Sequence, residues 1–316
     1  MPDATDGEFA SHPCAPRRSL GGKVPGLDAF LARAPTPIVR ERGDAAASAG
    51  EDRTIVNEFA GLRRAANREL VEERVGGGTL DTGATVPAGV LEEMKDYYRA
   101  RAGEYDEWFE RRGRFDQGRE ANGRWFADAA DAFAALDALA MTGDLLELAP
   151  GTGIWTERLL TTATSVTAVD ASPEMIEINR ARVDDERVDY VVADLFAWQP
   201  DRQYDGVCFG FWLSHVPAER LDPFFQMIAA ALKPGGKLFF VDNGHRDQTS
   251  TAADQPLPTP ETQVMTRRLN DGRTFQVVKN FYEPHLLTAV CAKVGLDVTV
   301  HQTPTYFLYG AGTRQG

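Results

Sequence analysis

The sequence predicts an α/β fold in which helices cover both faces of a mostly parallel sheet. From about residue 140 onward, short apolar runs of strand length alternate with amphipathic helical stretches. Strands that are apolar throughout are typical of a sheet buried on both faces, as parallel sheets are. The chain has 316 residues, of which 43% are hydrophobic, and it is long enough to bury such a core.

The expected elements follow one another in a regular order. Two helices with aromatic residues on their apolar positions come first, over 88–111 and 117–139. The alternating part is then expected to comprise strand 145–148, helix 153–163, strand 165–169, helix 173–183, strand 188–192, strand 206–211, helix 219–232 and strand 237–241. The final part is expected to hold strand 274–278, helix 284–294 and a closing pair of strands at 296–301 and 305–309.

The first 86 residues differ in composition from the rest, which we assign to one domain over 87–316. Residues 1–50 are rich in Ala, Pro and Gly without a long apolar period, so we expect a mostly disordered tail. Residues 51–86 are expected to form an extension, with a helix over 52–75 and a glycine-rich linker. That helix could act as a lid, in a homodimer, or only as an extension that packs on the surface, and the sequence does not choose among these.

Charge and composition narrow the partners of the chain. A net charge of −13 opposes binding to a nucleic-acid backbone. No apolar run approaches the ~18–20 residues that a membrane span needs. The three cysteines are far apart and form no pair with zinc or disulfide-framework spacing. The first residues are acidic where a signal peptide would be basic and then apolar, so a cytoplasmic location is expected.

The strongest local signal is a glycine-containing turn between a strand and a helix. Gly151 and Gly153 follow the run Asp-Leu-Leu-Glu-Leu-Ala-Pro, and a helix is expected to begin at Ile154. Glycines at such a turn let the backbone approach a ligand at the carboxyl edge of the sheet. A dinucleotide motif is incomplete because Thr156 stands at its third glycine, and no Gly-Lys-Ser/Thr follows to make a phosphate-binding P-loop.

Two acidic residues end the next two expected strands. Asp170 follows an apolar strand and precedes Ser172-Pro173, which is also a good helix start for purely local reasons. A carboxylate at this position can accept hydrogen bonds from both hydroxyls of a ribose. Asp194 ends the following strand, where it can accept from the amine of an adenine. With the glycine turn, the three strand ends outline a nucleoside site.

The chain resembles the class I S-adenosylmethionine-dependent methyltransferases of the small-molecule type over residues 87–316. The resemblance lies in the order Glu147-x-Ala149-x-Gly151-x-Gly153, Asp170, Asp194 and Lys233-Pro-Gly-Gly236. It implies a Rossmann-like sheet of seven strands with the last strand antiparallel, and S-adenosylmethionine as cofactor. It assigns cofactor binding to Tyr98, Tyr105, Glu147, Ala149, Gly151, Gly153, Asp170, Ala171, Met175, Asp194, Leu195 and Phe211.

The same resemblance distributes parts of the cofactor among these residues. The two glycines would let the methionine moiety approach, with Glu147 behind them. Asp170 would hold the ribose, Met175 would pack under the adenine, and Asp194 with Leu195 would face its amino edge. One departure from the family pattern is Ala149, which stands where the family has its first glycine.

The candidate catalytic residue is His215, in the loop after the fourth expected strand. It could be a general base that removes a proton from the acceptor, or a structural histidine that fixes the loop, and we favour the structural interpretation. The candidate acceptor-binding residues, from their place in the fold, are Trp212, Asn243, His245 and Tyr282. The polar insertion 246–272 is expected to form a mobile flap on the same edge.

The family's metal-dependent members guide the prediction about metals. They need an aspartate after the fourth strand as well as an Asp-Asn pair after the fifth. Here Asp242-Asn243 is present, but no carboxylate follows Phe209. Since half of an oxygen-ligand set does not make a site, no metal is expected.

The function expected from the sequence is therefore metal-independent methyl transfer to an oxygen, nitrogen or carbon of a small molecule, plausibly a secondary metabolite. Two alternatives stay open: a protein or peptide methyltransferase, and a non-catalytic module that binds S-adenosylmethionine. A nicotinamide-dependent dehydrogenase is disfavoured by Thr156 and Asp194.

Overall fold

The computed structural model describes residues 85–244, 252, 255–258 and 262–316. The predictions for the tail over 1–50 and for the helix over 52–75 lie outside the described residues, as does His245.

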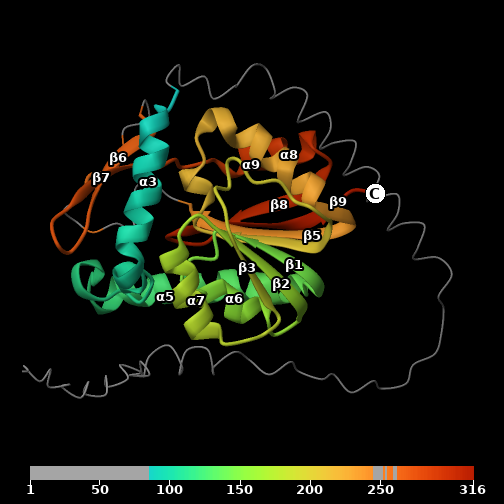
Figure 1. Ribbon diagram of the computed structural model, residues 1–316, viewed down its shortest axis with the longest axis horizontal. Helices are drawn as coiled ribbons and strands as arrows, with labels where there is room; N and C mark the ends of the chain where they lie inside the picture. Colours follow the sequence, from blue (N-terminus) through green and yellow to red (C-terminus); the bar gives the residue numbers. More distant parts are fainter. Residues whose placement is uncertain (1–84, 245–251, 253–254, 259–261) are drawn as a thin grey trace, which may run out of the picture. The chain divides into compact units, whose positions relative to one another are not determined.

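Seven strands form one sheet in the order β3-β2-β1-β4-β5-β9-β8 (Figure 1). Their bounds are β1 Gly143–Leu148, β2 Ala163–Asp170, β3 Val188–Val192, β4 Tyr204–Gly210, β5 Leu232–Asn243, β8 Leu296–Gln302 and β9 Phe307–Arg314. Neighbouring strands from β3 to β5 pair in parallel, whereas β9 runs antiparallel between β5 and β8. The predicted seven-stranded, mostly parallel sheet with an antiparallel last strand is confirmed.

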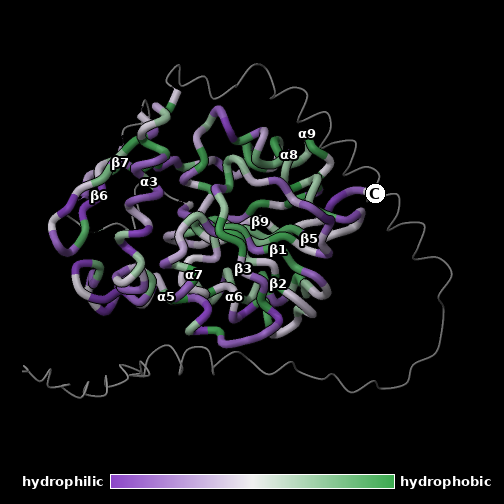
Figure 2. Tube along the Cα trace, in the orientation of Figure 1, coloured by the Kyte–Doolittle hydropathy of each residue, from purple (hydrophilic) through white to green (hydrophobic). Residues whose placement is uncertain are grey.

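Helices cover both faces of this sheet. On one side lie α5 Arg119–Leu139, α6 Ile154–Leu159 and α7 Pro173–Val183, and on the other lie α8 Leu221–Ala231 and α9 Pro284–Lys293 (Figure 1). The tube is hydrophobic where β1 and the second half of β5 run through the sheet (Figure 2), and Leu145, Leu146, Leu148 and residues 238–241 are buried there. Among the described residues, no helix has the length and hydropathy needed to cross a bilayer.

The expected helix over 88–111 is broken in the structure. It forms α3 Ala88–Arg101, a 3₁₀ turn Ala102–Glu104 and a short helix α4 Tyr105–Phe109. Gly103 lies in the turn, and glycine is among the weakest helix formers. The break redirects the chain while Tyr98 and Tyr105 both remain at the wall of the cleft described below.

A second, two-stranded sheet lies outside the main one. It pairs β6 Val264–Arg268 antiparallel with β7 Thr274–Val278. The strand at 274–278 was expected, but its partner falls in the polar insertion that we expected to be a flap. The hairpin packs on α3 through a small apolar cluster that comprises Leu91, Met94, Tyr97, Met265, Leu269, Val277 and Val278. These long-range contacts stabilise a strand that composition alone did not indicate.

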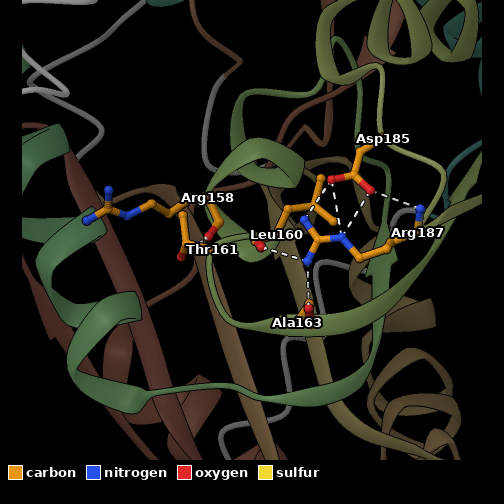
Figure 3. Close-up of polar contacts among 6 residues, drawn as sticks. All are labelled: Arg158, Leu160, Thr161, Ala163, Asp185 and Arg187. Carbon is orange, nitrogen blue, oxygen red and sulfur yellow. Dashed lines mark hydrogen bonds and ion pairs between the residues drawn. The ribbon is translucent and has the colours of Figure 1, made fainter.

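The start of β2 is held by Arg187, which precedes β3 (Figure 3). Its Nη1 donates to the carbonyl oxygens of Leu160 at 3.1 Å and Ala163 at 3.0 Å. The same guanidinium pairs with Asp185, two residues earlier, through Nε and Nη2. The bonds join the chain before β3 to the first residue of β2, and thereby help to position the strand that ends in Asp170.

Candidate functional site

A cleft of about 660 Å³ opens at the carboxyl ends of β1, β2 and β4. This is the edge at which parallel α/β sheets bind their ligands. Ten of the twelve residues predicted to bind the cofactor line it: Tyr98, Tyr105, Ala149, Gly151, Asp170, Ala171, Met175, Asp194, Leu195 and Phe211. The structure also brings Met94, Lys95, Ser172, Phe196, Trp212 and His215 to its walls.

The two remaining residues, Glu147 and Gly153, lie behind the cleft. Gly153 is the residue before α6 and has φ +97°, and a Cβ there would lie 2.9 Å from the Asn179 side chain. Glu147 is 1% exposed, and burial raises the pKa of its carboxyl to about 8, which the neighbouring Thr156 only partly offsets. Gly153 therefore sets the turn, while Glu147 is a protonated acid at neutral pH.

The strained backbone of the turn extends to Ala149. Ala149 has φ +52° and Gly151 has φ +55°, both in the left-handed region that favours glycine. An alanine in this region costs roughly 1–2 kcal/mol. The position at which this chain departs from the family pattern thus keeps the backbone conformation that a glycine would adopt freely.

Asp170 is held by the backbone on both of its oxygens. The Gly151 N–H donates to Oδ2 at 3.2 Å and the Ser172 N–H donates to Oδ1 at 2.8 Å. Each oxygen keeps a lone pair for a second donor, such as a ribose hydroxyl. Burial raises the pKa of Asp170 to about 6, and these backbone bonds oppose the increase.

Asp194 connects the chain just after β3 to helix α3. Its Oδ2 accepts from Lys95 Nζ at 3.1 Å, and its Oδ1 accepts from the Phe196 N–H at 2.9 Å. Lys95 itself lines the cleft, beside Met94 from the same helix. The ion pair thus holds α3 across one end of the cleft.

A second connection fixes α4 over the glycine turn. The Thr152 hydroxyl donates to Asp106 Oδ1 at 2.6 Å, and Arg182 Nη1 donates to the Thr152 oxygen at 3.2 Å. Arg182 also forms an ion pair with Asp106. These contacts tie α4, the turn and α7 together.

His215 is buried with both ring nitrogens occupied. Nδ1 lies 2.6 Å from the Val278 carbonyl oxygen, which can only accept, so Nδ1 carries the proton. Nε2 then accepts from the Tyr98 hydroxyl, 2.6 Å away. Burial lowers the pKa of His215 well below its usual value, and the charge of Lys279 adds to the effect. The ring is neutral at physiological pH.

A smaller cavity of about 340 Å³ adjoins the cleft. Four residues line both spaces: Tyr98, Tyr105, Phe211 and His215. Phe211, which follows β4, has φ +58°, an uncommon backbone conformation for an aromatic residue. Its ring centroid lies 4.7 Å from that of Trp108, which also lines the smaller cavity.

The structure separates the predicted acceptor residues. Asn243 lines the smaller cavity, whereas Trp212 lines the larger cleft. Tyr282 lines neither space, and its buried hydroxyl donates to the Val216 carbonyl at 2.7 Å.

Sequence reasoning missed three cations that line the smaller cavity: Arg101, Arg267 and Lys279. Arg267 lies on β6, within the insertion expected to be a flap. A partial signal was available in the sequence, because the turn residues Asn-Asp-Gly at 270–272 stand directly before the expected strand 274–278 and are typical of a hairpin.

The cleft suits S-adenosylmethionine on its own chemistry. Asp170 presents two hydrogen-bond acceptors, Met175 and Leu195 supply buried apolar surface, and the turn at Gly151 exposes backbone. Neither oxygen of Glu147 is in hydrogen-bond geometry with a protein group of the described chain. The buried Glu147 carboxyl next to the turn therefore has no hydrogen-bond partner for its oxygens within the described ranges. The residues present therefore fit a nucleoside joined to an amino acid.

Comparisons with known proteins agree with this geometry. The profile of a family described as "Methyltransferase domain" matches residues 145–236. The structure of DhpI in complex with SAH is 35% identical with a TM-score of 0.60, and the match covers 73% of this chain and 99% of that chain. A complex of DhpI with SAM and HEP is 36% identical, with the same TM-score, and the match covers 72% and 99%.

Among curated relatives, the ubiquinone biosynthesis O-methyltransferase of Xanthomonas euvesicatoria pv. vesicatoria (strain 85-10) is 31% identical over 161 residues. This match covers 49% of the chain and 62% of that relative's length. The demethylmenaquinone methyltransferase of Clavibacter sepedonicus is 36% identical over 98 residues, which cover 30% and 38%.

The sheet order and the cleft at its carboxyl edge are those of an α/β protein with a ligand site at the ends of its parallel strands. With the matches above, the chain belongs to the class I S-adenosylmethionine-dependent methyltransferases, as the sequence motifs predicted. S-adenosylmethionine is the cofactor of this family.

Proposed function

We propose that this chain transfers a methyl group from S-adenosylmethionine to a small-molecule acceptor held in the smaller cavity. The observation that carries the proposal is the shared wall: Tyr98, Phe211 and His215 line both the cofactor cleft and the adjoining cavity. This space is small and is lined by nine residues of the described chain, which suits a small molecule. A protein or peptide acceptor would need a longer groove.

The methyl transfer depends mainly on how the acceptor is positioned against the cofactor. The cofactor supplies a methyl group on a positively charged sulfur, which accepts the bonding pair as the acceptor's lone pair takes the methyl. Tyr98 and His215 occupy each other's hydrogen-bonding groups, so they shape the wall and hold α3 to the loop after β4. Fixing the acceptor in line with the reacting bond would then provide most of the rate.

We further propose that the reaction needs no metal. Asp242 Oδ2 accepts from the Ser214 N–H at 2.8 Å, and Oδ1 accepts from the Asn243 N–H at 2.7 Å. Lys279 Nζ lies 3.9 Å from Oδ1 and would repel a metal cation there. Exhaustive dialysis against EDTA should leave the rate unchanged, and a rate that only added divalent metal restores would contradict this.

The acceptor is proposed to carry its nucleophile on oxygen, nitrogen or carbon, within a secondary metabolite or another small metabolite. The O-methyltransferase and demethylmenaquinone methyltransferase relatives are named for small-molecule chemistry, which supports this class.

Calorimetric titration with S-adenosylmethionine, S-adenosylhomocysteine and NAD tests the cofactor part of the proposal. Binding of the first two without NAD supports it and justifies an acceptor screen, scored by formation of S-adenosylhomocysteine. Binding of NAD alone would refute it. Tight cofactor binding with no turnover on any acceptor would favour the non-catalytic module.

A further inference from the structure

We propose that the smaller cavity is an oxyanion site, so that the acceptor is a small molecule carrying a phosphate-type or carboxylate group. The inference rests on the proposed function and deepens it by giving the substrate class. It starts from the three cations on the cavity wall, Arg101, Arg267 and Lys279, which come from α3, β6 and the segment after β7.

All three cations are buried. Arg101 is 5% exposed, Arg267 is 8% exposed and Lys279 is 4% exposed. Removing a charged side chain from water is expensive unless an opposite charge or hydrogen bonds compensate for it. No carboxylate lines the cavity within the described part of the chain.

Only one of the three cations, Lys279, forms an ion pair within the described chain. Lys279 lies 3.9 Å from the buried Asp242 carboxylate and donates to the Ser214 hydroxyl at 2.9 Å. Arg267 donates to the neutral Gln255 side chain at 2.8 Å and has no carboxylate partner among the described residues. Arg101 and Arg267 therefore have no ion-pair partner among the described residues, although the charge of Glu104 favours the charged form of Arg101 from a distance.

Arg101 is the least satisfied of the three. Its guanidinium lies 4.9 Å from the ring centre of Tyr105 and 5.5 Å from that of Tyr97. These ring faces offset part of the cost of burial, but they accept no strong hydrogen bond. Within the described ranges the Arg101 guanidinium forms no hydrogen bond or ion pair, so its donors stay available at the cavity that it lines.

The positive charges of the cluster lower the pKa values of the groups beside them. The pKa of Lys279 is lowered to about 8, mainly by burial; Asp242 opposes this, and the charges of Arg267 and Arg101 contribute to the decrease. All three cations also lower the pKa of His215. Two planar guanidiniums beside an ammonium are suited to a group with several anionic oxygens.

The test titrates wild-type protein with inorganic phosphate, acetate and neutral acetamide by calorimetry at constant ionic strength, with and without saturating S-adenosylhomocysteine. We expect saturable binding of phosphate, acetate or both, and none of acetamide. Phosphate alone would assign the acceptor to the phosphate type, and acetate alone to the carboxylate type. Absence of anion binding under both conditions would overturn the oxyanion site.

The matched variants are Arg267→Met and Arg268→Met, because the two arginines are neighbours on β6 and only Arg267 is buried at the cavity. Losing a charged hydrogen bond should weaken anion binding about tenfold or more in Arg267→Met. Arg268→Met should stay within about twofold of wild type. Equal anion affinity in Arg267→Met and wild type would place the anion elsewhere and overturn the proposal.

A second pair protects the test against a folding defect. If Arg267→Met does not fold, Arg101→Met is compared with Arg99→Met, whose arginine is exposed on the same helix. S-adenosylhomocysteine affinity is measured in every variant. If the wild type binds anions but not S-adenosylhomocysteine, only the proposed function is refuted. If it binds S-adenosylhomocysteine but no anion, only the oxyanion site is refuted.

Discussion

The Tyr98 hydroxyl donates to His215 Nε2 across 2.6 Å, and this bond joins α3 to the loop after β4. The ring's other nitrogen donates to the Val278 carbonyl, so one histidine connects the α3 helix, the β4 loop and the end of β7. A neutral ring with both nitrogens engaged is a positioning element for the wall between the cleft and the cavity.

Substitution of His215 separates positioning from base catalysis. His215→Asn keeps an amide donor that can face Val278, but it removes the basic ring nitrogen. We expect a rate within about tenfold of wild type, since a ring whose pKa lies well below its usual value and whose two nitrogens are both engaged acts by positioning. A rate loss of ~10²-fold or more in stopped assays at saturating cofactor would instead identify His215 as the general base.

Removal of the Tyr98 hydroxyl tests its hydrogen bond to His215 from the donor side. Tyr98→Phe leaves the buried Nε2 without its donor, which should lower the free energy of unfolding by about 1–3 kcal/mol. Urea denaturation without ligand measures the change. An unaltered midpoint and slope would mean that the bond contributes nothing to the apo fold.

Cofactor affinity should depend on the ionisation of Asp170. Its carboxylate accepts from two backbone N–H groups and is ionised only above a pKa of about 6. Because a protonated carboxyl loses an acceptor site, the dissociation constant for S-adenosylhomocysteine should rise as the pH falls from 7 toward 5. Calorimetry over this range measures it.

Asp170→Asn is expected to bind several-fold more weakly at pH 7.5, because its amide would point a donor at one of the two backbone donors. Its pH dependence should flatten as well. Asp189→Asn, an exposed substitution on β3, is the matched control and should retain the wild-type profile. A wild-type profile in Asp170→Asn would show that the ribose lies elsewhere.

Gly153 should tolerate no side chain. Gly153→Ala places a Cβ 2.9 Å from buried Asn179 at φ +97°, so stability should fall by at least about 1–2 kcal/mol. The control is Gly103→Ala in the 3₁₀ turn, where a Cβ meets nothing within 4 Å. Thermal melts of the two variants should differ in this direction, and equal melts would be evidence against the strained turn.

The parts of the site that sequence could predict are those read from short, continuous segments. Gly151 and Asp170 each stand at a strand end with a helix start just after, so their meeting at one sheet edge follows from the parallel topology. The strand bounds 188–192 and 274–278 agree with the structure for the same reason, because their apolar runs are local.

The cationic cavity could not be predicted in this way. Arg101 and Arg267 are far apart in the sequence, and they meet because the β6–β7 hairpin packs on α3. Each cation alone is an ordinary charged residue in a polar segment. Only the tertiary packing removes their solvent and places them around one space, so composition gave no sign of their shared position.

Glu147 offers a test of the buried acid independent of any ligand. Its pKa is about 8 in the fold against 4.5 for an ordinary glutamate, so between these values the folded state holds a proton that the unfolded chain has lost. The stability of the wild type should therefore decline as the pH rises through this window, by about 1.4 kcal/mol per unit from this group. Glu147→Gln removes the titration while keeping a similar neutral side chain.

Urea denaturation of the wild type and Glu147→Gln at pH 5, 6, 7 and 8 should give a difference in unfolding free energy that shifts steadily in favour of the variant. Other titrating groups cancel in this difference, because both proteins carry them. Glu177→Gln, an exposed position on α7, should show no such trend. Parallel stability profiles for the wild type and Glu147→Gln would mean that Glu147 is ionised in the fold, with a partner that offsets its burial.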